Sequence, residues 1–172
     1  MAARGEERTE VRKTYLEMRS VEDLLPARSS EPGLSVERVF DCPAAFYRFL
    51  YREVGRAYRW EDRASWTDDE IRAHLRKPEI SLHLLSCRGA PAGYFELARC
   101  PDGTTEIAYF GLLPEFLRRG LGKHLLTVAT EEAFATGATR IWLHTCSLDD
   151  PAALPNYQRR GFSAFRSETY WV

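Results

Sequence analysis

The chain has 172 residues, a length typical of one domain, and 44% of them are hydrophobic, which is enough for one sizeable core. A formal net charge of −1 excludes binding to nucleic acid or to an anionic membrane through overall charge. No apolar run approaches the length of a membrane span, and residues 1–10 lack the apolar stretch of a secretory signal. We therefore expect a cytoplasmic protein without nucleic-acid or membrane partners.

The four cysteines are scattered along the chain and form neither a CxxC pair nor a cluster with histidine. They are Cys42, Cys87, Cys100 and Cys146. This spacing gives no sign of a zinc site, so we expect reduced thiols and no bound metal.

The first half of the chain predicts a polar, flexible leader over residues 1–13, followed by a single domain over residues 14–172. The spacing of apolar residues then predicts two strands and two helices. These are a strand over 14–20, a strand over 34–40, a helix over 43–54 and a helix over 67–76. Asp41 is the expected cap of the first helix, and Thr67 with Glu70 matches a capping box at the second.

The middle of the chain changes to a strand pattern, with short turns that contain Gly89 and Gly103. Strands are predicted over residues 80–88, 92–99 and 107–113. Because a short turn joins the first two, they predict an antiparallel meander. The third contains no charged residue, which indicates a strand covered on both faces.

The last third predicts a helix over 120–136, a strand over 140–145, a helix from Asp150 and a strand or tight strand pair over 162–172. A strand, a glycine loop, a helix and a second strand form a parallel, right-handed crossover. The expected fold is therefore α/β, with a mixed, mostly antiparallel sheet and helices on both faces. Pro155 removes a helical N–H, so we expect it to distort the first turn of the last helix.

The sharpest motif is the segment LRRGLGKHLL over residues 117–126. Gly120 and Gly122 precede a long helix, whose first N–H groups and positive dipole end suit a diphosphate. The P-loop pattern GxxxxGK[ST] is absent, and the dinucleotide fingerprint lacks its third glycine because position 125 is Leu. The glycines alone equally fit a tight turn, and a nucleotide-binding protein is an alternative.

Two longer stretches carry a resemblance to a known family. Residues 106–126, EIAYFGLLPEFLRRGLGKHLL, resemble the acetyl-CoA-binding motif of the GNAT N-acetyltransferase superfamily. Residues 153–162, ALPNYQRRGF, are similar to the family's second signature, Ala-x-x-x-Tyr-x-x-x-Gly-Phe. The resemblance covers residues 92–162 and implies the GNAT fold, in which the co-substrate acetyl-CoA lies between two splayed parallel strands and no metal takes part.

The resemblance also implies which residues hold the coenzyme. The pantetheine should follow the strand near Leu112, where an N–H of Leu112 or Leu113 would stabilise the oxyanion of the attacked thioester. Position 117 departs from the family, which usually has Gln or Arg where this chain has Leu117. The diphosphate should meet backbone N–H groups and neighbouring cations at the start of the longest helix, namely Arg118, Arg119, Gly120, Leu121, Gly122 and Lys123.

The same resemblance implies two catalytic roles. Tyr157 is the expected general acid, since a phenol with a pKa of about 10 can donate to the leaving thiolate; the alternative is a ring packed in the core. Glu106 is the expected general base, because an alkyl amine with a pKa of about 10.4 is almost wholly protonated at neutral pH. A water chain could replace it, or it could pair with a surface arginine instead. Glu96 is the reserve base.

The loop over residues 55–66 is rich in aromatic and acidic side chains, and in this family the equivalent connection lines the acceptor site. Its expected contacts are Tyr58, Trp60, Glu61, Asp62 and Trp66. The strand residues Glu96 and His144 join them, although the tryptophans equally fit packing of the loop and the histidine a packed strand. The expected acceptor is a primary amine of a small molecule or peptide. A homodimer through the exposed final strand is left open, as is a non-catalytic acyl-CoA-binding module on the same fold.

Overall fold

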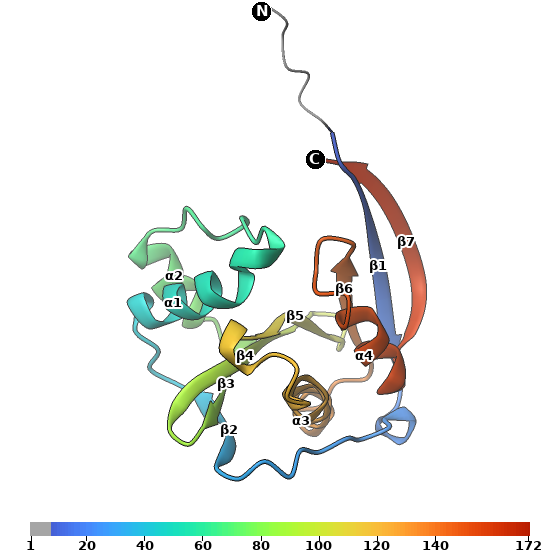
Figure 1. Cartoon of the computed structure of the whole chain (residues 1–172), viewed down its shortest axis with the longest axis horizontal. Coiled ribbons are helices and arrows are strands. Elements are labelled where there is room, and N and C mark those ends of the chain that lie inside the picture. The colour runs from blue at the N-terminus through green and yellow to red at the C-terminus, as the bar shows by residue number, and fades with distance from the viewer. Residues whose placement is uncertain (1–7) are drawn as a thin grey trace, which may run out of the picture.

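One seven-stranded sheet organises the computed structural model, which describes residues 8–172 (Figure 1). The order across the sheet is β2-β3-β4-β5-β6-β1-β7, and its pairs are antiparallel except for β5 with β6. The expected mixed, mostly antiparallel α/β fold is therefore confirmed. The strands are β1 (Glu10–Met18), β2 (Leu34–Val39), β3 (Ile80–Cys87), β4 (Ala90–Arg99), β5 (Thr105–Leu112), β6 (Ile141–Cys146) and β7 (Ser163–Trp171).

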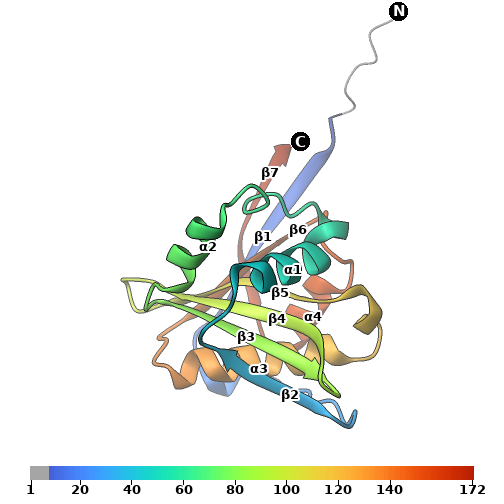
Figure 2. The same ribbon diagram turned by 90° about the vertical axis from the view of Figure 1, so that its left-hand side faces the viewer.

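Helices cover both faces of the sheet, as Figure 2 shows. α1 (Ala44–Gly55) and α2 (Asp68–Leu75) pack on one face over β3, β4 and β5, whereas α3 (Leu121–Ala135) and α4 (Ala153–Arg159) lie on the other. The apolar stripe of α3 is fully buried, which is why this segment is the most clearly helical in the sequence. Short 3-10 turns are η1 (Val21–Asp23), η2 (Arg56–Tyr58) and η3 (Pro114–Phe116).

The parallel strands β5 and β6 pair at two positions and then part. Thr105 lies opposite Ile141 and Glu106 opposite Trp142. Just beyond, Leu97 of β4 pairs with Ile107 while Glu96 pairs with Tyr109, so that Ala108 is an extra, bulged residue of β5. β6 meanwhile pairs with β1 on its other side. The parallel splay implied by the family resemblance is therefore present.

The starts of β1 and β5 differ from the sequence expectations. β1 begins at Glu10, inside the expected leader, because Val11 is fully buried and β7 supplies a pairing partner that local sequence does not reveal. Residues 1–7 of that leader lie outside the described residues. Glu106 lies inside β5 and not before it, since β5 starts at Thr105, where pairing with β6 begins.

The helix starts test the predicted caps. The capping box of α2 is confirmed: Oγ1 of Thr67 accepts from the N–H of Glu70 at 3.2 Å, and the Glu70 carboxylate accepts from the N–H of Thr67 at 2.7 Å. Asp41 was the wrong cap for α1, because the residue before its first turn is Pro43 and no side chain caps it.

The last helix starts later than predicted. α4 begins at Ala153, while Asp150 accepts from the N–H of Ala152 at 2.8 Å in the preceding turn. Pro155 therefore falls in the first helical turn, where a backbone N–H has no helical acceptor to lose. The distortion expected from this proline has no physical cause in that position.

Candidate active site

The unpaired edge of β5 presents a backbone donor to the gap beside β6. The N–H of Leu113 donates to the carbonyl of Ala92 in β4 at 2.8 Å and is therefore engaged. Successive residues of a strand direct their N–H groups to opposite sides, so the N–H of Leu112 points away from β4. On that side β6 has already parted from β5. Of the two expected donors, Leu112 is the one that faces the gap.

Further backbone donors gather where α3 begins. Gly120, the residue before the first turn, has a left-handed φ of 73°, and Arg118 has a φ of 60°. Within the described residues, the turn, loop and side-chain hydrogen bonds use no N–H from residues 118–123. We call the backbone of these residues the cradle. Its N–H groups, with the positive end of the α3 dipole, suit a diphosphate.

Gly122 shows where the cradle lies. A Cβ at this position would meet Nδ2 of Asn156 in α4 at 3.7 Å and a methyl group of Leu112 at 3.9 Å. The first turn of α3 therefore lies beside the end of β5, next to α4. The residues present fit acetyl-CoA, because donors for the diphosphate and an open strand edge for an amide-containing chain adjoin each other.

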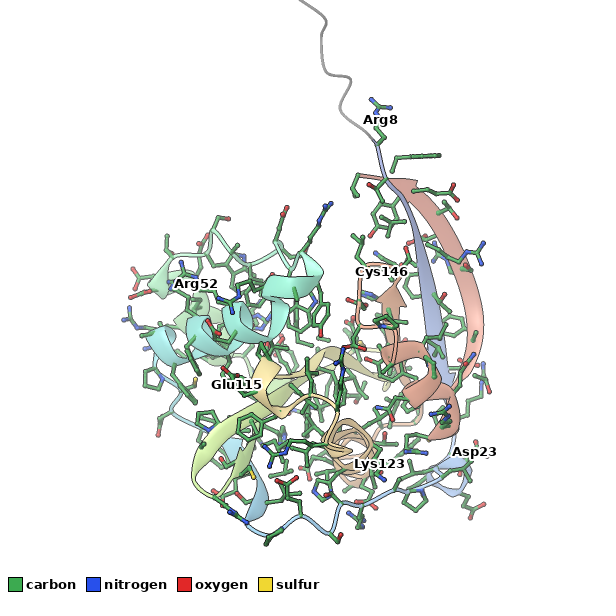
Figure 3. All side chains as sticks on the ribbon, in the orientation of Figure 1. Arg8, Asp23, Arg52, Glu115, Lys123 and Cys146 are labelled. Atoms are coloured by element: carbon green, nitrogen blue, oxygen red, sulfur yellow. The ribbon has the colours of Figure 1, made fainter. Side chains whose placement is uncertain are left out.

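The side chains around the cradle point in different directions. Arg119 pairs with Glu31, and its guanidinium lies 5.0 Å from the ring of Phe116, so it points toward the segment before β2. Lys123 is exposed on α3, as labelled in Figure 3. Leu117 packs against the main core, which explains an apolar residue at this position.

Glu106 and His144 face each other where the gap opens. Oε1 of Glu106 lies 4.0 Å from Nε2 of His144, and their side chains are 23% and 40% exposed. Burial raises the pKa of Glu106, an effect that the charge of Arg63 opposes and that of Glu96 reinforces. Burial, with help from Lys13, lowers the pKa of the His144 imidazole. A carboxylate of raised basicity beside a neutral imidazole can accept a proton from an amine.

Tyr157 lies in the α3–α4 layer on the other face of the sheet. Its ring is 6% exposed and packs edge-on against Phe110 of β5 and against Phe162, with centroids 6.0 and 6.3 Å apart. Burial raises the pKa of its phenol, and the charge of Asp149 adds to the rise. The residue therefore has the packing role of a core tyrosine and also carries a hydroxyl that stays protonated.

The segment between α1 and α2 forms the opposite wall of the site. We call residues 56–67 the acceptor loop, after the role that the sequence analysis predicts for them. In Figure 1 this loop and the β1–β7 ribbon rise on opposite sides of β5 and β6. Figure 3 marks the same two sides, with Arg52 on α1 and Cys146 at the end of β6. Glu106 and His144 belong to the strands between these two sides, and we call the region around this pair the mouth.

The predicted acceptor residues of the loop have defined contacts. The hydroxyl of Tyr58 donates to Oδ2 of Asp150 at 3.1 Å, which ties the loop to the segment before α4, and burial raises the pKa of this phenol to about 12. Trp60 packs against Tyr51 and Tyr109, with ring centroids 5.7 and 5.0 Å apart. Its ring therefore supports the wall instead of standing free in the mouth.

Glu96 is placed differently from the other predicted residues. It lies in β4 under α1, fully buried, and Nη1 of Arg63 contacts its two oxygens at 2.9 and 2.8 Å. The ion pair engages both oxygens of this carboxylate, which is closed off from solvent.

Two residues of the site, Arg63 and Tyr109, were not predicted from the sequence. Arg63 looks like one of many arginines, and no local pattern distinguishes it. Tyr109 turns its hydroxyl toward the acceptor loop, where it donates to Oδ2 of Asp62 at 3.1 Å. The cause is the bulge at Ala108, which changes the face on which the following residue lies, and the sequence carries no signal for it.

Comparisons with known proteins match most of the chain to one family. The family described as Acetyltransferase (GNAT) family matches residues 45–162. A mycothiol acetyltransferase from Saccharopolyspora erythraea is 26% identical over 118 residues, which make up 66% of this chain and 39% of that protein.

Solved structures share the fold over nearly the whole chain. A GCN5-related N-acetyltransferase from Kribbella flavida has a TM-score of 0.66 and 26% identity, covering 95% of this chain and 58% of its own. A functionally unknown conserved protein from Staphylococcus epidermidis has a TM-score of 0.69 and 17% identity, covering 96% and 62%. The chain thus spans less than two thirds of the length of these relatives. In the described residues, no helix is long and apolar enough to cross a membrane, and no group of three His, Cys, Asp or Glu residues could hold a metal ion.

Proposed function

The chain belongs to the GNAT family of acetyltransferases, and from that premise we propose that it is an N-acetyltransferase acting on a primary amine of a small molecule or peptide. The amine nitrogen bonds to the acetyl carbon of acetyl-CoA, the carbon–sulfur bond breaks, and CoA leaves as the thiolate. The transfer is direct, within a ternary complex.

One observation carries this proposal: the cradle, the inward N–H of Leu112 and the splay of β5 from β6 adjoin one another. The cradle offers its backbone donors to a diphosphate. The 3.9 Å approach of a Cβ at Gly122 to Leu112 places those donors next to the free edge of β5. At that edge the N–H of Leu112 can donate to a carbonyl oxygen as it gains negative charge.

The proposed base of the reaction also lies beside the gap between β5 and β6. Glu106 is partly buried, its pKa is raised by that burial, and it lies 4.0 Å from His144. An attacking amine must lose a proton, and a carboxylate whose pKa is raised toward neutrality takes it more readily. We assign Glu106 as the base, directly or through one water, with His144 as its neighbour in the same wall.

The proposed hydrogen-bond donor to the leaving group comes from α4. Tyr157 stays protonated because burial raises the pKa of its phenol, and it packs against Phe110 of β5. We assign its hydroxyl to the thiolate of CoA, to which it can donate. Because the ring is wedged between Phe110 and Phe162, the hydroxyl has little freedom to move away.

A free-thiol release assay with acetyl-CoA and a library of primary amines tests the proposal. Each amine is matched with its N,N-dimethyl analogue, which has a similar charge but cannot yield a stable amide. Thiol release with at least one primary amine, and none with its analogue, is the expected result. Thermal-shift measurements with acetyl-CoA and with ATP complete the test. Stabilisation by acetyl-CoA without turnover of any amine would indicate a binding module, and stabilisation by ATP alone a nucleotide-binding protein.

A further inference from the structure

A buried ion pair beneath the acceptor loop has no part in the steps proposed above. Glu96 lies within β4 with 0% exposure, and Arg63 reaches it from the acceptor loop at 2.8 Å. A carboxylate so deeply buried is strongly destabilising unless it is paired and hydrogen-bonded. The side chain of Arg63 therefore extends from the loop into the interior, where it pairs with Glu96.

Three segments converge on this carboxylate. Nε2 of His74 in α2 lies 3.2 Å from Oε1 of Glu96, and the hydroxyl of Tyr47 in α1 lies 3.1 Å from it. With Arg63, the contacts join α1, the acceptor loop and α2 to the middle of the sheet. Glu96 is thus saturated and closed off from an acceptor amine, which argues against its role as reserve base.

Arg63 is held by both its main chain and its side chain. Its backbone N–H donates to the hydroxyl of Tyr51 at 3.1 Å. Its guanidinium lies 4.3 Å from the ring centroid of Tyr109 and 4.7 Å from that of Trp66. Because a planar guanidinium that stacks and pairs at once has one favourable orientation, the residues next to Arg63 are fixed with it.

The residue before Arg63 is Asp62, which this arrangement places at the mouth. Oδ2 of Asp62 accepts from the hydroxyl of Tyr109 at 3.1 Å. None of the ion pairs within residues 8–172 includes Asp62. Burial and the neighbouring Cys146 raise the pKa of Tyr170 in β7, and the charges of Asp149 and Asp62 add smaller increments to the rise. Asp62 is therefore an exposed carboxylate that has no cationic partner among the described residues.

On the premise of the proposed function, we propose that Asp62 binds an ammonium group of the acceptor and that Arg63 and Glu96 are positioning residues that hold it there. The attacking nitrogen has to be neutral, so the ammonium at Asp62 is a second basic group of the same molecule. The substrate class is therefore an amine with at least two basic nitrogen atoms. Asp62 is a specificity-determining residue, and the buried pair acts only through it.

Three variants test this assignment. Asp62→Asn removes the charge at the mouth. Glu96→Leu combined with Arg63→Met removes both buried charges and leaves apolar side chains, an exchange that buried ion pairs often tolerate. Arg48→Met is the matched control, because the partly exposed Arg48 also tethers the end of the loop, to the carbonyl of Trp66 at 2.9 Å and, at the start of α2, to Asp68 at 2.6 Å.

The probes are α,ω-diaminoalkanes and the monoamines of equal chain length. We expect the wild-type kcat/KM for the best diamine to exceed that of its monoamine by about tenfold, the effect of one well-placed ion pair. Asp62→Asn should abolish the difference by raising the diamine KM, with the acetyl-CoA KM unchanged. The Glu96→Leu/Arg63→Met variant should do the same, and adding Asp62→Asn to it should have no further effect. Arg48→Met should keep the wild-type preference.

Each role has its own contradicting result. Equal diamine KM values for Asp62→Asn and wild type would overturn the specificity role, and an unchanged diamine KM in the Glu96→Leu/Arg63→Met variant would overturn the positioning role. Absence of thiol release by the wild type with every amine would instead be a failure of the proposed function. In that case calorimetry of diamine binding tests Asp62. Amide hydrogen exchange over residues 59–67 tests the buried pair. The exchange should be faster in the Glu96→Leu/Arg63→Met variant than in Arg48→Met.

Discussion

The two sides of the gap between β5 and β6 are built from different kinds of groups. On the α3 side, the donors offered to a ligand are backbone N–H groups, those of the cradle and of Leu112. On the acceptor side, the polar groups of the site are side chains that come from β4, β5, β6 and the acceptor loop. Backbone donors depend on the local conformation of a few consecutive residues, whereas converging side chains depend on contacts between distant segments. We call the α3 side the coenzyme side, after the proposed function. Ligand binding on the coenzyme side should therefore tolerate changes of side-chain charge, and ligand binding on the acceptor side should not.

The largest effect is expected from filling the cradle. Gly122→Leu places a branched side chain where a Cβ alone already comes within 4 Å of Asn156 and Leu112. The added bulk would push a diphosphate away from several charged hydrogen bonds, each worth about 1.5–3 kcal/mol. We expect the KM for acetyl-CoA, or its Kd by calorimetry, to rise by at least about a hundredfold.

The control for this variant removes charge and leaves the backbone alone. Arg118→Ala with Lys123→Ala takes away two exposed cations near the cradle. Exposed charges contribute little in water, so the combined loss should stay within about tenfold. A larger effect from the charge variant than from Gly122→Leu would break the contrast between a backbone-built and a side-chain-built side.

The coenzyme side was also the side that the sequence predicted well. A glycine before a long helix and an uncharged run before it are local features, and they gave α3, the parallel crossover and the order of the elements. What the sequence could not give were the exact strand limits. β1 begins early because β7, far away in the chain, pairs with it, and Glu106 falls inside β5 because β6 pairs there.

The acceptor side shows why side-chain clusters resist prediction. The sequence indicated an aromatic, acidic loop, but not that Arg63 would cross to Glu96 or that Tyr109 would face Asp62. The first depends on the packing of α1 and α2 over β4, and the second on a single bulged residue at Ala108. Neither leaves a periodic trace, since each joins positions that are separated by many residues.

A second, somewhat smaller effect should separate Glu106 from its neighbour. Glu106→Gln keeps the size of the side chain and removes the base, so kcat should fall by about a hundredfold with little change in the acetyl-CoA KM. His144→Gln is the matched variant on β6. It should lose less activity, about fivefold, if the imidazole only shapes the surroundings of Glu106. A larger loss in His144→Gln than in Glu106→Gln would make His144 the proton acceptor.

The pH dependence of kcat gives a second test of Glu106 as the base. Glu106 must be unprotonated to act, and burial raises its pKa above the ordinary value of 4.5. The wild-type kcat should therefore fall as the pH drops toward that raised pKa, at a higher pH than for an exposed carboxylate. Glu106→Gln should lack this acidic limb. A limb that persists unchanged in the variant would assign it to another group.

Among the three main variants, the smallest effect is expected at Tyr157, which is the exception to the contrast because it is a side chain on the coenzyme side. Burial raises the pKa of its phenol above 10, whereas an alkyl thiol has a pKa of about 8.5. Moving the proton fully from this phenol to a thiolate is therefore uphill. We expect the hydroxyl to donate a hydrogen bond to the leaving sulfur instead, a contribution of about 1.5 kcal/mol.

Tyr157→Phe should then lower kcat by about tenfold, since the ring and its contacts with Phe110 and Phe162 are retained. Tyr58→Phe is the matched control, because it loses a hydroxyl that is bonded to Asp150 and lies at the loop. Its effect should fall on the acceptor KM and leave kcat unchanged. A thousandfold loss in Tyr157→Phe would require complete proton transfer, and hence a phenol far more acidic than burial beside Asp149 allows. No loss at all would leave the thiolate to depart without help, as its own acidity permits, and reduce Tyr157 to the packing of α4 on β5.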